Sequence, residues 1–234
     1  MLSKIGFLYM SEITEEIKKD IVDQLYWDDR IDASNIKVSV SDGKVTLSGS
    51  VPSFSAKNAA RADAVSVKGV ILIDNQLKVV FPSSVKVPTD EEIKSNIKNA
   101  LSLTSDINDK NINVDVKDGV VTLYGNINSV WQKVKTEQIV SDMTGVFEIV
   151  NELAVVPTEK ILDEKIAEDI VAALIRNYNI DVEEIDIKVE DGIVNLYGNV
   201  SDWRSYDALI NTVRCTRGVL DIDDNLKVQN PVIL

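Results

Sequence analysis

The sequence predicts an α+β protein of three tandem modules, each with two helices packed on one face of a three-stranded mixed sheet. Three observations support this prediction. Similar segments recur as SDGKVTLSGSV (41–51), KDGVVTLYGNI (117–127) and EDGIVNLYGNV (190–200). The copies are offset by 76 and then 73 residues, with no length change inside any copy. Each copy also passes through the same order of helical and strand periodicities, which gives the element order αββαβ.

Nine glycines mark the repeat, three in each copy. The second glycine follows the first by six residues, and the third follows the second by twenty; the set is Gly43, Gly49, Gly69, Gly119, Gly125, Gly145, Gly192, Gly198 and Gly218. We interpret all nine as structural. The first of each copy belongs to a turn, the second to a bulge or close backbone approach, and the third to a helix end. A ligand role at these positions is the less favoured alternative.

Each copy opens with a predicted amphipathic helix. Apolar residues spaced i, i+4, i+8 form one stripe: Ile17/Ile21/Leu25, Ile93/Ile97/Leu101 and Ile166/Ile170/Leu174. We expect the first copy's helix to begin at Ser11 or Thr14, and the second copy's at Thr89. Residues 1–10 then form an N-terminal extension.

Two alternating runs follow each helix and predict a β-hairpin. The first runs are Ile36/Val38/Val40, Ile112/Val114/Val116 and Ile185/Ile187/Val189, and the second are Val45/Leu47, Val121/Leu123 and Val194/Leu196. An Asp-Gly pair joins them in every copy, which is the strongest short-range hairpin signal and requires positive φ at both residues.

A second helix and a last strand complete each module. The expected helix caps are Ser53, Ser129 and either Ser201 or Asp202, and the expected strands run over 70–80, 146–156 and 219–228. The predicted modules are 11–81, 88–156 and 161–229. Their linkers are short and contain proline, which predicts limited relative freedom.

Composition excludes several function classes. The net charge is −13, which opposes sequence-independent nucleic-acid binding because that requires clustered Lys and Arg. The chain has no histidine and a single cysteine, Cys215. Histidine is the commonest general base and metal ligand. We therefore expect no enzyme activity, no cofactor and no catalytic residues.

The N-terminal sequence led us to expect a cytoplasmic protein. The apolar stretch from Ile5 to Met10 is about six residues long, whereas a secretory signal needs roughly 7–15. No run approaches the ~20 apolar residues of a membrane-spanning helix.

The repeated pattern, an apolar helix, a DGxVxLxG hairpin, a further helix and GVxxIxNxLxV, resembles the BON domain, the bacterial osmotic-stress and nodulation module. The resemblance extends from about residue 11 to residue 229. It implies a non-catalytic binding module in osmotic or envelope stress adaptation, for which phospholipid headgroups are the usual proposed ligand and a protein partner is the alternative. In the third copy Asp224 replaces the asparagine of the motif found at Asn75 and Asn151.

Basic and aromatic residues on the second helices are the candidate contact residues. In the first copy, the least acidic of the three, these are Lys57, Arg61 and Lys68; in the others they are Trp131, Lys133, Lys135, Trp203 and Arg204. Trp131 is expected to be exposed, and Trp203 more in the core. Of Tyr26 and Trp27, one is expected in the core and the other at a neighbouring module.

A second function class is an ion or small-ligand sensor that binds K⁺ or Ca²⁺ through acidic loops. Asp221, Asp223 and Asp224 form the first candidate cation cluster, although solvated surface charge is the default interpretation. Cys215 is expected to be a small buried residue rather than a nucleophile.

Overall fold

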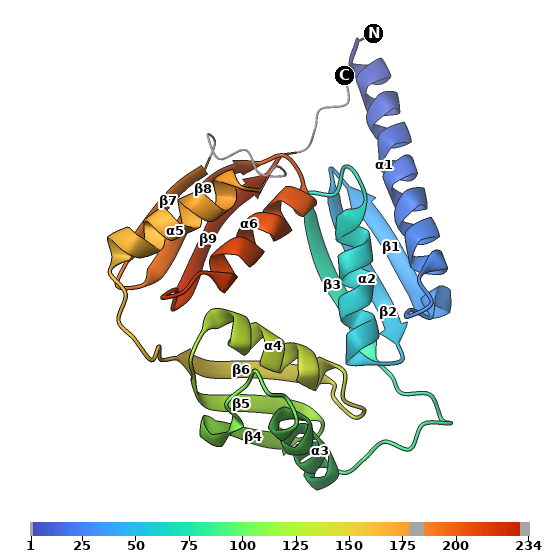
Figure 1. Cartoon of the computed structure of the whole chain (residues 1–234). Coiled ribbons are helices and arrows are strands. Elements are labelled where there is room, and N and C mark those ends of the chain that lie inside the picture. The colour runs from blue at the N-terminus through green and yellow to red at the C-terminus, as the bar shows by residue number, and fades with distance from the viewer. Residues whose placement is uncertain (1, 178–184, 230–234) are drawn as a thin grey trace. The chain divides into compact units, whose positions relative to one another are not determined.

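The computed structural model describes residues 2–177 and 185–229, with side chains from Glu12 onward. Within these ranges the chain forms three separate three-stranded sheets, each covered on one face by two helices (Figure 1). The predicted fold class is confirmed. None of the helices in the described part of the chain is long and apolar enough to cross a membrane.

The three modules have the same element order. The first contains α1 (Leu2–Trp27), a 3₁₀ turn (Ala33–Asn35), β1 (Ile36–Ser41), β2 (Lys44–Val51), α2 (Phe54–Ser66) and β3 (Leu72–Val79). The second contains α3 (Asp90–Ser102), a 3₁₀ turn (Asp109–Asn111), β4 (Ile112–Lys117), β5 (Val120–Ile127), α4 (Val130–Ser141) and β6 (Glu148–Val155). The third contains α5 (Asp163–Ile175), β7 (Ile185–Glu190), β8 (Ile193–Val200), α6 (Trp203–Cys215) and β9 (Asp221–Val228).

Each sheet places the hairpin's second strand in the centre. β1 and β2 are antiparallel, with Val38 opposite Leu47, and β2 and β3 are parallel, with Val45 opposite Ile73. The other two sheets repeat this register. Asp42 and Gly43 have φ of 49° and 74°, as the primed hairpin turn requires. A parallel pair needs a crossover connection, and α2 supplies it.

The core of each module lies between the helices and the sheet. Ile21 on α1 and Val45 and Leu47 on β2 are fully buried, as are their counterparts in the other two modules. Each such side chain stabilises the fold by about 1.5–3 kcal/mol relative to an exposed one. The predicted apolar stripes are therefore the core-facing sides of the first helices.

Two predicted helix boundaries are wrong. The first helix does not begin at Ser11 or Thr14, because α1 starts at Leu2 and continues unbroken to Trp27. Residues 2–10 thus extend this helix, since no proline interrupts it and Ser11 and Thr14 lie within it rather than at its start. The third glycine does not close the second helix either. α2 ends at Ser66, and Gly69 lies in the following loop with φ of 91°.

Most of the predicted helix caps are confirmed. Thr89 and Glu92 form a reciprocal capping box at the start of α3. Ser53 and Asp202 accept hydrogen bonds from the backbone at the starts of α2 and α6. Ser129 precedes α4 but makes no side-chain cap hydrogen bond. Its hydroxyl is instead buried without a partner among the described residues.

By its contacts the chain divides into two compact units. One includes the first module, through Val87, and the other is Pro88–Gln229, which contains the second and third sheets.

We predict that Gly49→Ala strongly destabilises the first module. A Cβ at Gly49 would overlap the carbonyl oxygen of Asn35, and the glycine φ of 114° is unfavourable for other residues. Positive φ alone costs about 1–3 kcal/mol, to which the overlap adds. Urea unfolding followed by circular dichroism measures the loss, with Ser50→Ala as the neighbouring control. Equal unfolding midpoints for the two variants would contradict this account of Gly49.

Candidate functional site

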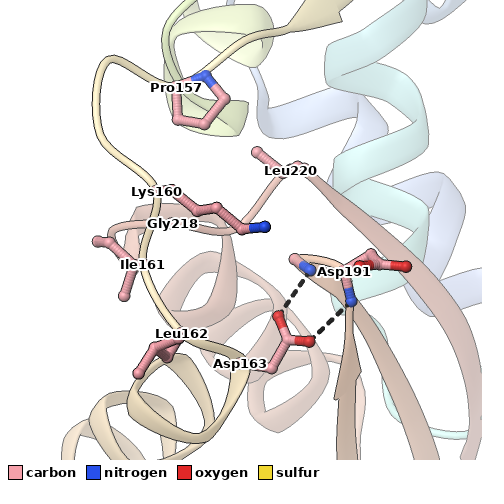
Figure 2. Close-up of a pocket in the computed structure, with 9 residues that line it drawn as sticks. Pro157, Lys160, Ile161, Leu162, Asp163, Asp191, Gly218 and Leu220 are labelled. Atoms are coloured by element: carbon pink, nitrogen blue, oxygen red, sulfur yellow. Dashed lines mark hydrogen bonds between the residues drawn. The ribbon is translucent and has the colours of Figure 1, made fainter.

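An aspartate fastens the first helix to the hairpin turn in two of the modules. The two carboxylate oxygens of Asp163 accept hydrogen bonds from the backbone N–H groups of Asp191 and Gly192, at 2.8 and 2.9 Å (Figure 2). Asp90 holds the turn of the second module in the same way, at 2.8 and 3.0 Å. The corresponding residue of the first module is Thr14. These carboxylates begin their helices, where negative charge is favourable, and they serve to hold the fold.

A pocket of about 480 Å³ lies beside this contact in the third module. It is lined by linker residues and by the hairpin turn, with Leu220 on one wall: Pro157, Lys160, Ile161, Leu162, Asp163, Asp191, Gly192, Gly218 and Leu220 (Figure 2). Lys160 would attract an anion, whereas Asp163 and Asp191 oppose one. The titratable residues of the lining are Lys160, Asp163 and Asp191, and both carboxylate oxygens of Asp163 already accept hydrogen bonds from the turn.

An asparagine links the last strand to the second helix in the first two modules. The Asn75 amide donates to the carbonyl oxygen of Lys57 at 3.1 Å, and its own oxygen accepts from the backbone N–H of Leu77 at 3.2 Å. Asn151 makes the same two contacts, with the carbonyl of Lys133 and the N–H of Leu153. The side chain thus satisfies one backbone group on each element.

In the third module this link is rebuilt with a different donor. Asp224 cannot donate to a carbonyl, but the hydroxyl of Tyr206 donates to Asp224 at 2.5 Å. Asp224 keeps the contact with the strand through the N–H of Leu226 at 3.0 Å. Tyr206 occupies the position of Lys57 and Lys133. Burial, and then the hydrogen bond to Asp224, raise the pKa of Tyr206 to about 12.

The prediction that Asp221, Asp223 and Asp224 form a cation site is wrong, because Asp224 is bound to Tyr206. Asp224 is engaged by Tyr206, whereas Asp221 and Asp223 alternate with Ile222 along β9 and therefore project from the opposite face of the strand. Among the described residues, no group of three or more metal-ligating side chains comes together. The three carboxylates thus do not form a common site.

The basic candidate residues of the first module lie on and just after α2. Lys57 is half-buried, and Arg61 and Lys68 are exposed. In the other modules Lys135 and Arg204 are exposed and Lys133 is half-buried.

The two tryptophans on the second helices have similar environments. Trp131 and Trp203 are both half-buried, so the expected exposure of Trp131 is wrong. The Trp203 ring packs edge-on against Tyr206, with the ring centroids 4.9 Å apart. Trp203 thus supports the tyrosine that reaches Asp224.

Exposed apolar side chains lie at the ends of the first helices. Tyr26 and Trp27 are 76% and 81% exposed, so the expectation that one of them is in the core is wrong. Leu103 and Ile175 are also largely exposed at the ends of α3 and α5. Val22 precedes Tyr26 by one helical turn and is 46% exposed. This second stripe on α1 was not predicted from the sequence, because only the buried stripe recurs in all three copies.

Burial contradicts one further expectation and identifies one residue that was not predicted. Cys215 is exposed at the end of α6, so its expected burial is wrong. Asp63, on the core side of α2, is a buried carboxyl group. It was not predicted from the sequence, because the aligned residues in the other copies are the uncharged Ile139 and Thr212.

The fold and its sites define a class of protein: a tandem array of small α+β modules whose repeated polar contacts hold the fold together. The sequence profile of the BON domain matches residues 13–80, 89–157 and 162–230. The chain therefore belongs to the BON domain family.

The chain is also similar to individual known proteins. The chain is 32% identical over 156 residues to osmotically-inducible protein Y of Escherichia coli strain K12, covering 65% of this chain and 76% of that protein. Two solved structures of the type III secretion protein CdsD of Chlamydia trachomatis also align. The first, of its C-terminal domain, shows 13% identity and a TM-score of 0.26, covering 91% of this chain and 96% of that one. The second shows 12% identity and the same TM-score, with 92% of each chain covered.

The expected cytoplasmic location is wrong. Osmotically-inducible protein Y is a periplasmic, envelope-associated protein. Our expectation relied on the short apolar stretch from Ile5 to Met10, and such a stretch does not determine a compartment.

We predict that substitutions of Tyr206 and Asp224 have non-additive effects on the free energy of unfolding. Tyr206→Phe removes the hydroxyl donor and should cost about 1 kcal/mol of unfolding free energy. Adding Asp224→Asn to that variant should recover most of the loss, because an amide at 224 can donate to the helix carbonyl as Asn75 does. Urea unfolding of the single and double variants measures the coupling.

Asn151→Asp is the matched control in the second module. No tyrosine stands at Lys133 to replace the lost donor, so this variant should be destabilised. Additive effects of Tyr206→Phe and Asp224→Asn would show that the two residues do not compensate for each other.

Proposed function

We propose that the chain is a non-enzymatic osmotic-stress protein that binds phospholipid headgroup surfaces through the helical side of its first module. Membership of the BON family and the similarity to osmotically-inducible protein Y support the stress role. The observation that carries the membrane contact is the exposure of Tyr26 and Trp27 at the end of α1. Tyrosine and tryptophan favour the membrane interface because their rings are apolar with a polar edge.

The basic residues of α2 support the same surface. α1 and α2 both pack on one face of the first sheet, so their exposed sides face away from that sheet together (Figure 1). Arg61 of α2 and Lys68 in the loop after it are exposed, and Lys57 is half-buried. Each basic residue near an anionic bilayer contributes about 1 kcal/mol. Apolar insertion and charge attraction would therefore act on one surface.

Net charge favours the first module over the others as the one that contacts an anionic membrane. Residues 11–87 carry a net charge of −1, whereas residues 88–160 carry −5 and residues 161–234 carry −8. The negative modules are repelled by an anionic surface at distances within a Debye length. The first module is thus the copy best suited to approach such a surface.

The second module supplies the residues for a test. Val22 and Tyr26 align with Lys98 and Ser102 of α3, which lack the exposed apolar stripe. We predict that Val22→Lys combined with Tyr26→Ser weakens binding to phosphatidylglycerol-containing vesicles at least tenfold, because apolar contact is lost. The added lysine would by itself strengthen attraction, so weaker binding isolates the apolar contribution. Co-sedimentation at low salt measures the affinity.

The matched control makes the same changes in the third module, as Val171→Lys with Ile175→Ser. Both residues are exposed on α5, but the proposal places no membrane contact there, so this variant should bind as the unchanged protein does. Equal losses in the two variants would reject the first module as the contact. A chain that never sediments with these vesicles would reject the lipid function and favour a protein partner.

A further inference from the structure

Among the residues that the structure describes, only the first module contains a buried carboxyl group. Asp63 lies on α2 with its side chain only 9% exposed. One of its carboxylate oxygens, Oδ2, has no hydrogen-bond partner among the described residues. An unpaired buried carboxylate is costly, whereas a protonated one can donate a hydrogen bond.

The groups that act on Asp63 come from α1 and the loop after it. Asp28 lies close enough to share a hydrogen bond with Asp63, and its side chain is 11% exposed. Arg30 binds Asp28 with two nitrogens, Nε at 2.9 Å from Oδ1 and Nη2 at 2.5 Å from Oδ2. The distance from Arg30 Nη2 to Asp63 Oδ1 is longer, 3.9 Å. Gln24 of α1 also lies near Asp63 and, as a smaller effect, acts to lower its pKa.

The two carboxyl groups consequently differ in acidity. Burial, and then the charge of Asp28, raise the pKa of Asp63 to about 6. Hydrogen bonds from Arg30 lower the pKa of Asp28 to about 2. Between these values Asp28 is ionised and Asp63 is protonated, so Asp63 can donate to Asp28. Above them both carboxylates are charged, and the single guanidinium is committed mainly to Asp28.

We propose that Asp28, Arg30 and Asp63 form an acid-responsive latch between α2 and the end of α1, closed when Asp63 is protonated and loosened when it ionises. The geometry supports this, because the pair joins two elements and leaves one buried oxygen unsatisfied. The other modules serve as internal controls. Ile139 and Thr212 stand at the position of Asp63, and Thr104 and Asn177 stand at that of Asp28.

The sign of the effect on stability follows from the two pKa shifts. The pKa of Asp63 is raised from 3.8, so its stabilising contribution is complete below about pH 3.8 and is lost as pH rises through 6. The pKa of Asp28 is lowered from 3.8, so its contribution is present above pH 3.8 and is lost as pH falls through 2. The latch should therefore be most stable near pH 4 and weaken between pH 4 and 7.

The test compares the full chain with its Asp63→Asn variant. An amide stays neutral and can donate to Asp28 at every pH. Hydrogen exchange of the α2 backbone is measured at several values between pH 5 and 7.5. The ratio of unchanged protein to variant cancels the intrinsic pH dependence of exchange. Opening of α2 in the unchanged protein, relative to the variant, should increase on the order of tenfold over this range.

A ratio that does not change with pH would overturn the latch. A carbon-13 titration of the Asp63 carboxyl group gives an independent measurement, and a midpoint near its ordinary value would also overturn it. Tyr26 and Trp27 directly precede Asp28, so the latch should also change membrane contact; that consequence rests on the proposed function. Vesicle binding tests it separately, because hydrogen exchange detects the latch whether or not vesicles bind.

Discussion

Each module depends on the packing of one isoleucine over a glycine. Ile17 lies over Gly69, and Ile93 and Ile166 lie over the corresponding glycines of the other modules. The isoleucine Cδ1 atoms are 2.6–2.9 Å from the point a glycine Cβ would occupy, closer than real contacts allow. The glycine starts the return from the second helix to the last strand. This contact therefore joins the first helix, the crossover and the sheet edge, and a side chain at Gly69 would separate them.

The repeat made most of this fold predictable, because core positions recur with little change. Ile21, Val45 and Leu47 have apolar counterparts in every copy, and periodicity assigns them to elements without knowledge of the fold. Contacts between distant residues were not predictable. Asp163 and its turn are 28 residues apart, and nothing local distinguishes this carboxylate from other acidic residues at helix starts. The start of α1 was mispredicted because threonine is a common N-cap residue, whereas Thr14 lies within the helix.

Differences between copies carry as much information as their similarities. Asp224 alone suggested only a local change, yet paired with Tyr206 it shows one link rebuilt from another donor. This compensation could in principle have been predicted from the sequence, because the positions of Tyr206 and Asp224 both change in the third copy. Asp63 could not be found in this way. The residues aligned with it in the second and third copies are Ile139 and Thr212, and only its burial in the structure shows that it is unusual. The module interior is thus held constant where packing demands it, and polar links vary where a second residue can adjust.

This pattern bears on why three copies stand in one chain. If all three modules bound the same anionic surface, their affinities would combine through avidity. The net charge falls from −1 in the first module to −8 in the third part of the chain, which works against such simultaneous binding. The exposed aromatic pair at Tyr26 and Trp27 is likewise confined to the first copy, where the latch also lies. Under the proposed function, one module makes a pH-dependent membrane contact and the acidic modules remain available to other partners.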